Sequence, residues 1–182
     1  MSISELNGWE LSSVKETVEA VKNQPEAGKL TWRSRVNWDG GFGLDVNTQE
    51  IEQLGQVIKR RFTIRGDHPP ELLGKNTGPT AVETLLAALG ACMAGTFAAQ
   101  ATMRGIKVDA LEIDLQGDID LNGFFGLQSV SPGLSNVKLS FRVKSDADSR
   151  TLQEILKSAQ SHSPVHESVT KPVEINARVS KM

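Results

Sequence analysis

The longest apolar stretch of the sequence, residues 78–105, predicts a buried helix. Thr80 and Glu83 stand three residues apart at its start, which is the spacing of a capping box. Arg104 followed by Gly105 is typical of a basic last turn and a C′ glycine. Apolar residues occupy nearly all sides between these ends, and such a helix belongs in a core.

At about 100° per residue this helix carries two stripes that differ in bulk. The large stripe consists of Val82, Leu86, Leu89, Met93 and Phe97. The small stripe consists of Ala87, Ala91, Gly95 and Ala99. Strands of the same chain can cover the large stripe, whereas the small stripe lets a second backbone approach closely. We therefore expect a two-fold homodimer in which two copies of this helix pack together. The alternative is a monomer in which another helix of the chain covers the small stripe.

Shorter periodic segments flank this helix and predict an α+β fold. Amphipathic helices are expected at Ser12–Lys22 and Asp148–Gln160, and the second of these is the helix that a monomer would place on the small stripe. Strands are expected at Leu30–Trp38, Phe42–Val46, Gln56–Ile64, Ile106–Leu121, Leu134–Lys144 and Val173–Val179. The strands follow one another instead of alternating with helices, which favours antiparallel sheets. We expect one domain over residues 1–182, with residues 1–28 as an N-terminal helical extension.

Two glycine-containing segments carry further expectations. Gly117 interrupts the strand expected at Ile106–Leu121 and predicts a bend or bulge. The loop at 122–132 is unusually apolar, with Phe124 and Phe125 among glycines. We expect this loop to fold back onto the core; the alternative is that it lines a pocket.

Composition excludes several classes of function. The formal net charge is −2, so no overall field attracts nucleic acid, and the single cysteine allows no internal disulfide. A lone thiol suits a reducing cytosol, and the N-terminus has neither the basic nor the apolar region of a signal peptide. The long helix is alanine-rich and carries Glu83, so we expect no membrane span and a cytoplasmic protein.

Cys92 is the first candidate for chemistry. A cysteine among alanines in mid-helix is most often a small buried hydrophobe, and Cys92 lies too far past Thr80 for the helix N-terminus to activate it. A reactive thiol here needs a cation, which arginines on or near the predicted strands can supply, Arg35 among them. Glu83 lies about half a turn around the helix and roughly 13 Å along it from Cys92, so within one chain capping suits it better.

His162, Ser163 and His166 form a second polar group near the C-terminus. The two histidines are four residues apart, but Pro164 breaks the helix between them and no third ligand is evident, so we expect no metal and no cofactor. Ser163 lacks the context of a hydrolase nucleophile. Before Pro164 it is better explained as the N-cap of a short helical turn.

Three segments resemble the OsmC/Ohr family of osmotically inducible and organic hydroperoxide resistance proteins. They read FTIRGDHPPELLGKNTGPTAVETLLAALGACMAG, RGIKVDALEIDLQGDIDLNGFFGL and SHSPVHESVTKPVEI, within a match from about Leu30 to Val179. The second, the third and the helix that ends at Pro25 are similar to the OsmC-like branch. The resemblance implies an intertwined homodimer in which antiparallel sheets wrap around two long central helices.

The resemblance also implies a chemistry. Family members are thiol peroxidases in which the cysteine matching Cys92 attacks the peroxide and a second cysteine then forms a disulfide. Ser163 stands at the second position here, so the two-cysteine cycle is ruled out. An arginine on the first hairpin and a glutamate before the helix activate the thiol in the family. Arg35 and Glu83 are the nearest matches, although neither stands at the family's own place.

We therefore expect a one-cysteine peroxidase of oxidative stress defence that reduces organic hydroperoxides and is restored by an external thiol. Met93, Phe124, Phe125, His162 and Ser163 are the expected pocket residues, beside Cys92, Arg35 and Glu83 as catalytic residues. The alternative is a non-catalytic dimer that binds a small apolar ligand.

Overall fold

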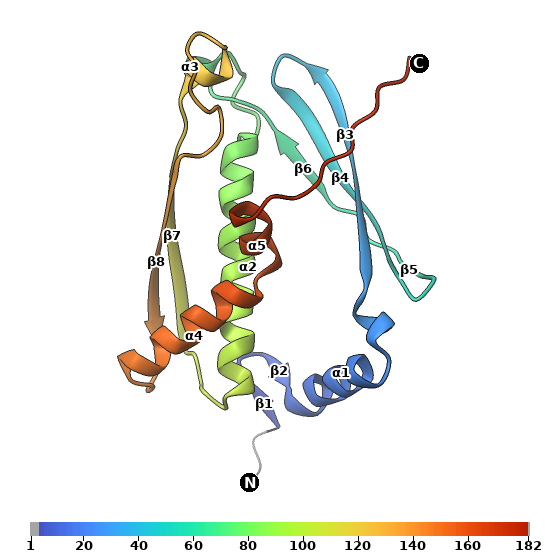
Figure 1. Ribbon diagram of the computed structural model, residues 1–182, viewed down its shortest axis with the longest axis vertical. Coiled ribbons are helices and arrows are strands. Elements are labelled where there is room, and N and C mark those ends of the chain that lie inside the picture. The colour runs from blue at the N-terminus through green and yellow to red at the C-terminus, as the bar shows by residue number, and fades with distance from the viewer. Residues whose placement is uncertain (1–3, 182) are drawn as a thin grey trace. The chain divides into compact units, whose positions relative to one another are not determined.

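The computed structural model describes residues 4–181, which form two compact units, 4–85 and 86–181. Figure 1 shows the helices and strands of each unit. The long helix α2 (Ala81–Met103) begins in the first unit and runs through the second.

The first unit begins with a small hairpin that the sequence analysis missed. Strands β1 (Glu5–Leu6) and β2 (Trp9–Glu10) pair antiparallel around Asn7 and Gly8. Both turn residues have positive φ, 52° and 83°, as a type I′ turn requires. An Asn-Gly pair is the strongest short signal for such a hairpin, so this element was predictable.

A four-stranded antiparallel sheet fills most of the first unit. After helix α1 (Leu11–Asn23) and the 3₁₀ turn η1 (Pro25–Gly28), strands β3 (Leu30–Gly40) and β4 (Gly43–Gln53) form a long hairpin. Strands β5 (Gln56–Ile58) and β6 (Thr63–Gly66) both pair with β4. The single strand expected at Gln56–Ile64 was therefore wrong, because the chain leaves the sheet between these two short strands. Strand β4 also continues well beyond Val46.

A buried carboxylate organises the loop before α2. Asp67 is 3% exposed and accepts hydrogen bonds from Thr77 Oγ1 at 2.7 Å and from the backbone N–H groups of His68, Lys75 and Thr77 at 2.8–3.1 Å. These bonds hold the pKa of Asp67 at about 2, with the Thr77 hydroxyl as the largest cause. The buried Asp67 carboxylate thus holds together the loop, which includes the 3₁₀ turn η2 (Pro70–Leu72).

The second unit packs a two-stranded hairpin and a helix against α2. Strands β7 (Ala110–Asp118) and β8 (Asn136–Lys144) pair antiparallel in one unbroken register, with half-buried and exposed residues alternating along each. Helix α4 (Ser149–His162) crosses α2, and α3 (Leu121–Phe124) and α5 (Pro164–Thr170) are short (Figure 1).

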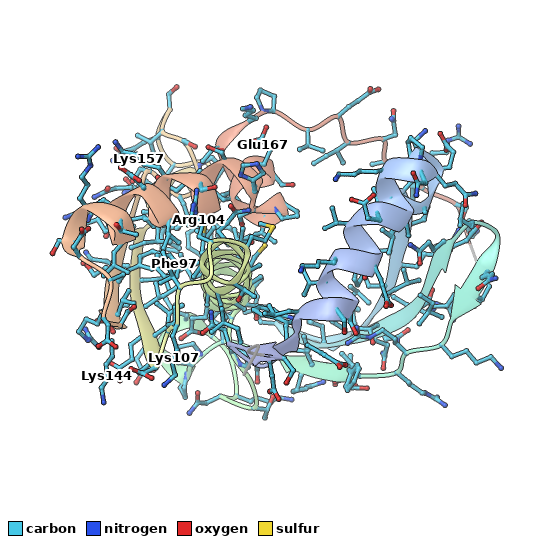
Figure 2. All side chains as sticks on the ribbon, turned by 90° about the horizontal axis from the view of Figure 1, so that it is seen from below. Phe97, Arg104, Lys107, Lys144, Lys157 and Glu167 are labelled. Atoms are coloured by element: carbon cyan, nitrogen blue, oxygen red, sulfur yellow. The ribbon has the colours of Figure 1, made fainter. Side chains whose placement is uncertain are left out.

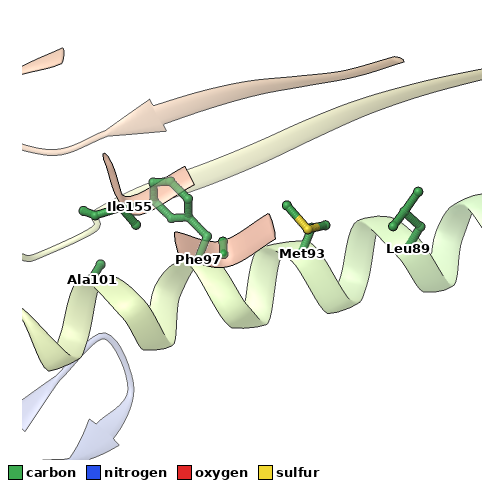
Figure 3. Close-up of a cluster of buried hydrophobic side chains, with 6 residues drawn as sticks. Leu89, Met93, Phe97, Ala101 and Ile155 are labelled. Carbon is green, nitrogen blue, oxygen red and sulfur yellow. The ribbon is translucent and has the colours of Figure 1, made fainter. Parts of the chain in front are cut away.

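The core of this unit forms on the large stripe of α2. Figure 3 shows Leu89, Met93, Phe97 and Ala101 in one row along α2, with Ile155 of α4 beside them. Figure 2 shows Phe97 inside this layer and Lys107, Lys144 and Lys157 at its periphery. Because Ile155 and Ala159 of α4 join this cluster, the helix covers the large stripe. The monomer alternative, in which α4 covers the small stripe, was wrong.

The small stripe is open in the single chain. Ala87, Ala91 and Gly95 are exposed, and a Cβ atom added at Gly95 would meet nothing within 4 Å. Alanines and a glycine of α2 and leucines and an isoleucine of β7 enclose a shallow hollow of about 290 Å³; its lining is Ala87, Gly90, Ala91, Ala94, Leu111, Ile113 and Leu115. The face that predicts a dimer thus remains open within the second unit.

Three further expectations for the second unit were wrong. Gly117 pairs with Val137 without a bulge, and its missing side chain leaves room for Leu134, whose Cδ2 would lie 2.7 Å from an added Cβ atom. The 122–132 loop does not fold onto the core, because Phe124 and Phe125 are 56% and 57% exposed. Residues 173–179 form no strand, since no strand of the described residues pairs with them.

Candidate functional site

Cys92 lies in the middle of α2 and is partly exposed. The next residue, Met93, points into the core of the second unit, whereas Cys92 is turned about 100° away from it around the helix. Its backbone carbonyl accepts a hydrogen bond from Thr96 Oγ1 at 2.8 Å. Cys92 therefore lies at the edge of the core and not inside it.

Ser163 is the side chain that contacts this sulfur. Its Oγ donates a hydrogen bond to Cys92 Sγ at 3.1 Å, although 71 residues separate the two in sequence. Ser163 is 1% exposed and is the N-cap of α5, where its Oγ accepts a hydrogen bond from the backbone N–H of His166 at 3.3 Å. The expected capping role is confirmed, and the structure adds the contact with the thiol.

Contacts between α4 and α2 hold Ser163 in this place. Ile155 and Ala159 are fully buried in the core cluster, and Ser158 Oγ donates to Gln100 Oε1 of α2 at 2.7 Å. Helix α4 then ends at His162, and Ser163 follows immediately. A packed helix and one polar contact thus place the Ser163 hydroxyl against the thiol.

The two histidines next to Ser163 differ in their surroundings. His162 is exposed, and its Nδ1 lies 2.7 Å from the carbonyl oxygen of Ser158 in its own helix. His166 is partly buried, and its Nδ1 is fully buried without a hydrogen-bond partner among the described residues. The sequence analysis placed His162 in the pocket and treated His166 only as a poor metal ligand. A sequence signal for this placement of His166 existed: it stands three residues after Ser163, and the N–H at that position is the one that an N-cap serine binds.

Glu83 and Thr80 form the capping box that their spacing predicts. Glu83 Oε2 accepts from the Thr80 backbone N–H at 2.7 Å, and Thr80 Oγ1 accepts from the Glu83 N–H at 3.1 Å. The Thr80 N–H lowers the pKa of Glu83 by stabilising its charged form. Arg35 lies on β3 opposite Asn47. Arg35 belongs to the first unit, so its approach to Cys92 stays a prediction. Glu83 and Cys92 lie about half a turn apart on the same helix, so an approach of Glu83 is predicted only toward the thiol of a second chain.

The other expected pocket residues are dispersed. Met93 is 1% exposed and belongs to the core, so in this chain its side chain does not line an open pocket. Phe124 and Phe125 pack edge to face with ring centroids 5.0 Å apart on the exposed loop. Within residues 4–181, no group of three or more His, Cys, Asp or Glu side chains is arranged to hold a metal ion.

By length and composition α2 is also apolar enough to cross a membrane. Its large stripe, however, packs against β7, β8 and α4 in the second unit. The apolar character of α2 is therefore that of a core helix.

Comparisons with known proteins agree on one family. The sequence model of the OsmC-like protein family matches residues 74–178, which include Cys92, Ser163 and His166. No curated protein matches the sequence significantly.

Solved structures show the same fold. The chain is similar to an OsmC-like protein from Mycoplasma pneumoniae, with a TM-score of 0.58 and 20% identity over 78% of this chain and 87% of that one. It is also similar to an organic hydroperoxide resistance protein, OsmC, from Legionella pneumophila, with a TM-score of 0.57 and 14% identity over 76% of this chain and 88% of that one. At these identities the likeness extends to the α+β fold and not to the activity.

Proposed function

Because the chain belongs to the OsmC-like protein family, we propose that it is a thiol-dependent peroxidase that reduces organic hydroperoxides through Cys92. The observation that carries this proposal is the contact in the half-buried residue Cys92, whose sulfur accepts a hydrogen bond from the buried hydroxyl of Ser163. One relative with this fold is described as an organic hydroperoxide resistance protein.

The proposed reaction begins with attack of the Cys92 thiolate on the terminal oxygen of the hydroperoxide. An S–O bond forms and the O–O bond breaks. The alkoxide that leaves takes up a proton from water, equivalent to the one that the thiol released on ionising, and becomes an alcohol. Cys92 is thereby oxidised to a sulfenic acid and the hydroperoxide is reduced. The chain has no second cysteine to form an internal disulfide. A first external thiol therefore forms a mixed disulfide with release of water, and a second external thiol regenerates Cys92 as the external disulfide leaves.

Arg35 and Glu83 remain the proposed supporting residues, and Phe124 and Phe125 the proposed contacts of the alkyl chain. Arg35 and Glu83 belong to this proposal through the family resemblance, and Phe124 and Phe125 through the apolar character of their loop. Within its own chain the Glu83 carboxylate is already bonded to the Thr80 N–H, so its proposed role is toward a second chain. We also propose that the protein works as a homodimer in the cytoplasm, where small thiols are abundant.

The test is hydroperoxide consumption with excess dithiothreitol, measured for the wild type and for Cys92→Ser. We expect consumption by the wild type and none above background for Cys92→Ser, because serine is a far weaker nucleophile. Ser168→Ala is a matched control, since Ser168 bonds only the Pro164 carbonyl among its recorded partners. Equal rates for the wild type and Cys92→Ser would end the proposal.

A second candidate function rests on Ser163, which stands where family members have the second cysteine: a non-catalytic dimer that binds a small apolar ligand. In this alternative the dimer binds such a ligand and Cys92 does no chemistry. Co-purification of an acyl or similar ligand with an unreactive Cys92 would favour it. Rapid reaction of Cys92 with iodoacetamide would contradict it, because a merely packed thiol reacts slowly.

A further inference from the structure

The proton of the Ser163 hydroxyl has one recorded acceptor. The oxygen of this hydroxyl accepts a hydrogen bond from the His166 backbone N–H, as an N-cap does. A hydroxyl has a single proton to donate, and here it points to Cys92 Sγ at 3.1 Å. The bond from the His166 N–H therefore orients the Ser163 hydroxyl, and the hydroxyl donates its proton to the sulfur of Cys92.

A thiolate sulfur has no proton and can only accept this bond. A hydrogen bond to an ionised acceptor is about twice as strong as one between neutral groups. Ser163 is 1% exposed, so bulk water does not compete for its hydroxyl. The contact is therefore stronger when Cys92 is charged than when it is a neutral thiol.

We propose that Ser163 is a catalytic residue of this site, whose hydroxyl stabilises the negative charge on Cys92 Sγ before attack. This inference rests on the proposed peroxidase function. It assigns to the serine a role that a cation commonly has beside reactive thiols. It also explains why the serine is buried against the sulfur, since capping α5 requires only the bond to His166.

The surrounding structure keeps this hydroxyl in place before any substrate arrives. The Ser158–Gln100 bond and the buried Ile155 and Ala159 hold the end of α4 against α2. Pro164 starts α5 directly after Ser163. Such preorganisation means that little reorganisation is needed when charge develops on the sulfur.

The test is an ultraviolet titration of thiolate absorbance in the full-length chain, for the wild type and Ser163→Ala, with Cys92→Ser subtracted as background. The chain contains no tyrosine and one cysteine, so the remaining signal belongs to Cys92. We expect the pH midpoint to rise by about one unit or more in Ser163→Ala, as the loss of a charged hydrogen bond implies. Ser168→Ala, another hydroxyl removal on α5, should leave the midpoint unchanged.

Ser163→Gly separates the charge effect from loss of the cap. Glycine retains most of the N-cap preference but has no hydroxyl, so we expect the same rise in midpoint with near-wild-type thermal stability. His166 is present in every variant, so none of the substitutions at Ser163 adds or removes a titratable side chain. An unchanged midpoint in both Ser163 variants would overturn the inference.

The two proposals fail in distinguishable ways. The titration needs no peroxide, so an unchanged midpoint together with Cys92-dependent peroxide consumption refutes the role of Ser163 alone. A wild type without Cys92-dependent consumption refutes the peroxidase proposal, and the inference falls with it as a statement about catalysis.

Discussion

At the scale of single residues, the contact between Cys92 and Ser163 determines which redox chemistry is open to the chain. A serine hydroxyl stabilises a charged sulfur but cannot form a disulfide with it. The sulfenic acid expected at Cys92 therefore has no partner thiol in its own chain. This site differs from a two-thiol site by one atom, because Ser163 has an oxygen where a cysteine would have a sulfur.

Ser163→Cys is expected to create an internal disulfide. The wild-type oxygen lies 3.1 Å from Cys92 Sγ, and a sulfur at that place needs only a small movement to reach the bond length of about 2 Å. One equivalent of an organic hydroperoxide should remove both free thiols from the variant, as measured by thiol counting. The double variant Ser163→Cys, Cys92→Ser is the control and should keep its thiol out of any internal disulfide. Persistence of two free thiols in Ser163→Cys would show that the two positions are not in contact.

Asp67 predicts a pH dependence of stability. Its pKa is about 2 in the folded chain against an ordinary value of 3.8, so the folded state favours the ionised form. The resulting stabilisation is present above about pH 4 and is lost as the pH falls toward about 2. Asp67→Asn should lower the thermal midpoint by several degrees at neutral pH, because its amide N–H₂ would face backbone donors.

The measurement is thermal unfolding of the wild type and Asp67→Asn between pH 2 and 7. The difference in thermal midpoint between the wild type and Asp67→Asn should become smaller as the pH falls through this range, since only the wild type loses a charged acceptor. Asp146→Asn, at an exposed position of the second unit, serves as the control. A gap that is constant with pH would refute the role given to the Asp67 charge.

At the scale of elements, the sequence predicts best where a local signal and a burial pattern agree. The start of α2 follows from the capping box of Thr80 and Glu83, which the structure confirms. The start of α4 follows similarly from Asp148, which accepts a hydrogen bond from the Thr151 N–H at 2.7 Å. Such signals need only neighbouring residues, so one sequence is enough to find them.

Elements that need a distant partner were harder to predict. The alternation from Val173 to Val179 is that of a strand, but a strand also needs an edge to pair with, and none within the described chain does so. The contact of Ser163 with Cys92 depends on how α4 crosses α2, which periodicity does not encode. The sequence thus predicted the two residues of the site but not the bond between them.

Thr80→Ala should weaken the start of α2. The variant loses the acceptor for the Glu83 N–H, and we expect the free energy of unfolding to fall by about 1 kcal/mol. Urea unfolding measures this change, and Thr80→Ser is the matched control because serine also caps well. If alanine and serine at this position gave equal stabilities, the capping box would contribute nothing.

At the scale of the whole molecule, large apolar side chains are exposed in each unit, and contiguous exposed apolar surface marks interaction sites. In the first unit Trp32 and Trp38 are 67% and 72% exposed, and in the second Ile175 is 85% exposed. Ala87, Ala91 and Gly95 of the small stripe of α2 are likewise exposed. These surfaces support the proposed homodimer, in which a second copy covers them.

Gly95→Leu separates assembly from folding. A Cβ atom at Gly95 meets nothing within 4 Å in its own chain, and leucine favours a helix over glycine by roughly 0.5–1 kcal/mol. The isolated chain should therefore tolerate the leucine, whereas a second helix that packs on the small stripe is held away from it. We expect the dimer dissociation constant, measured by sedimentation across a range of concentrations, to rise at least about tenfold. Ala20→Leu, on the exposed surface of α1, adds similar bulk away from the stripe and should leave assembly unchanged. A dimer of wild-type affinity in Gly95→Leu would place the interface elsewhere, and a wild type that stays monomeric at every concentration would remove the dimer from the proposal.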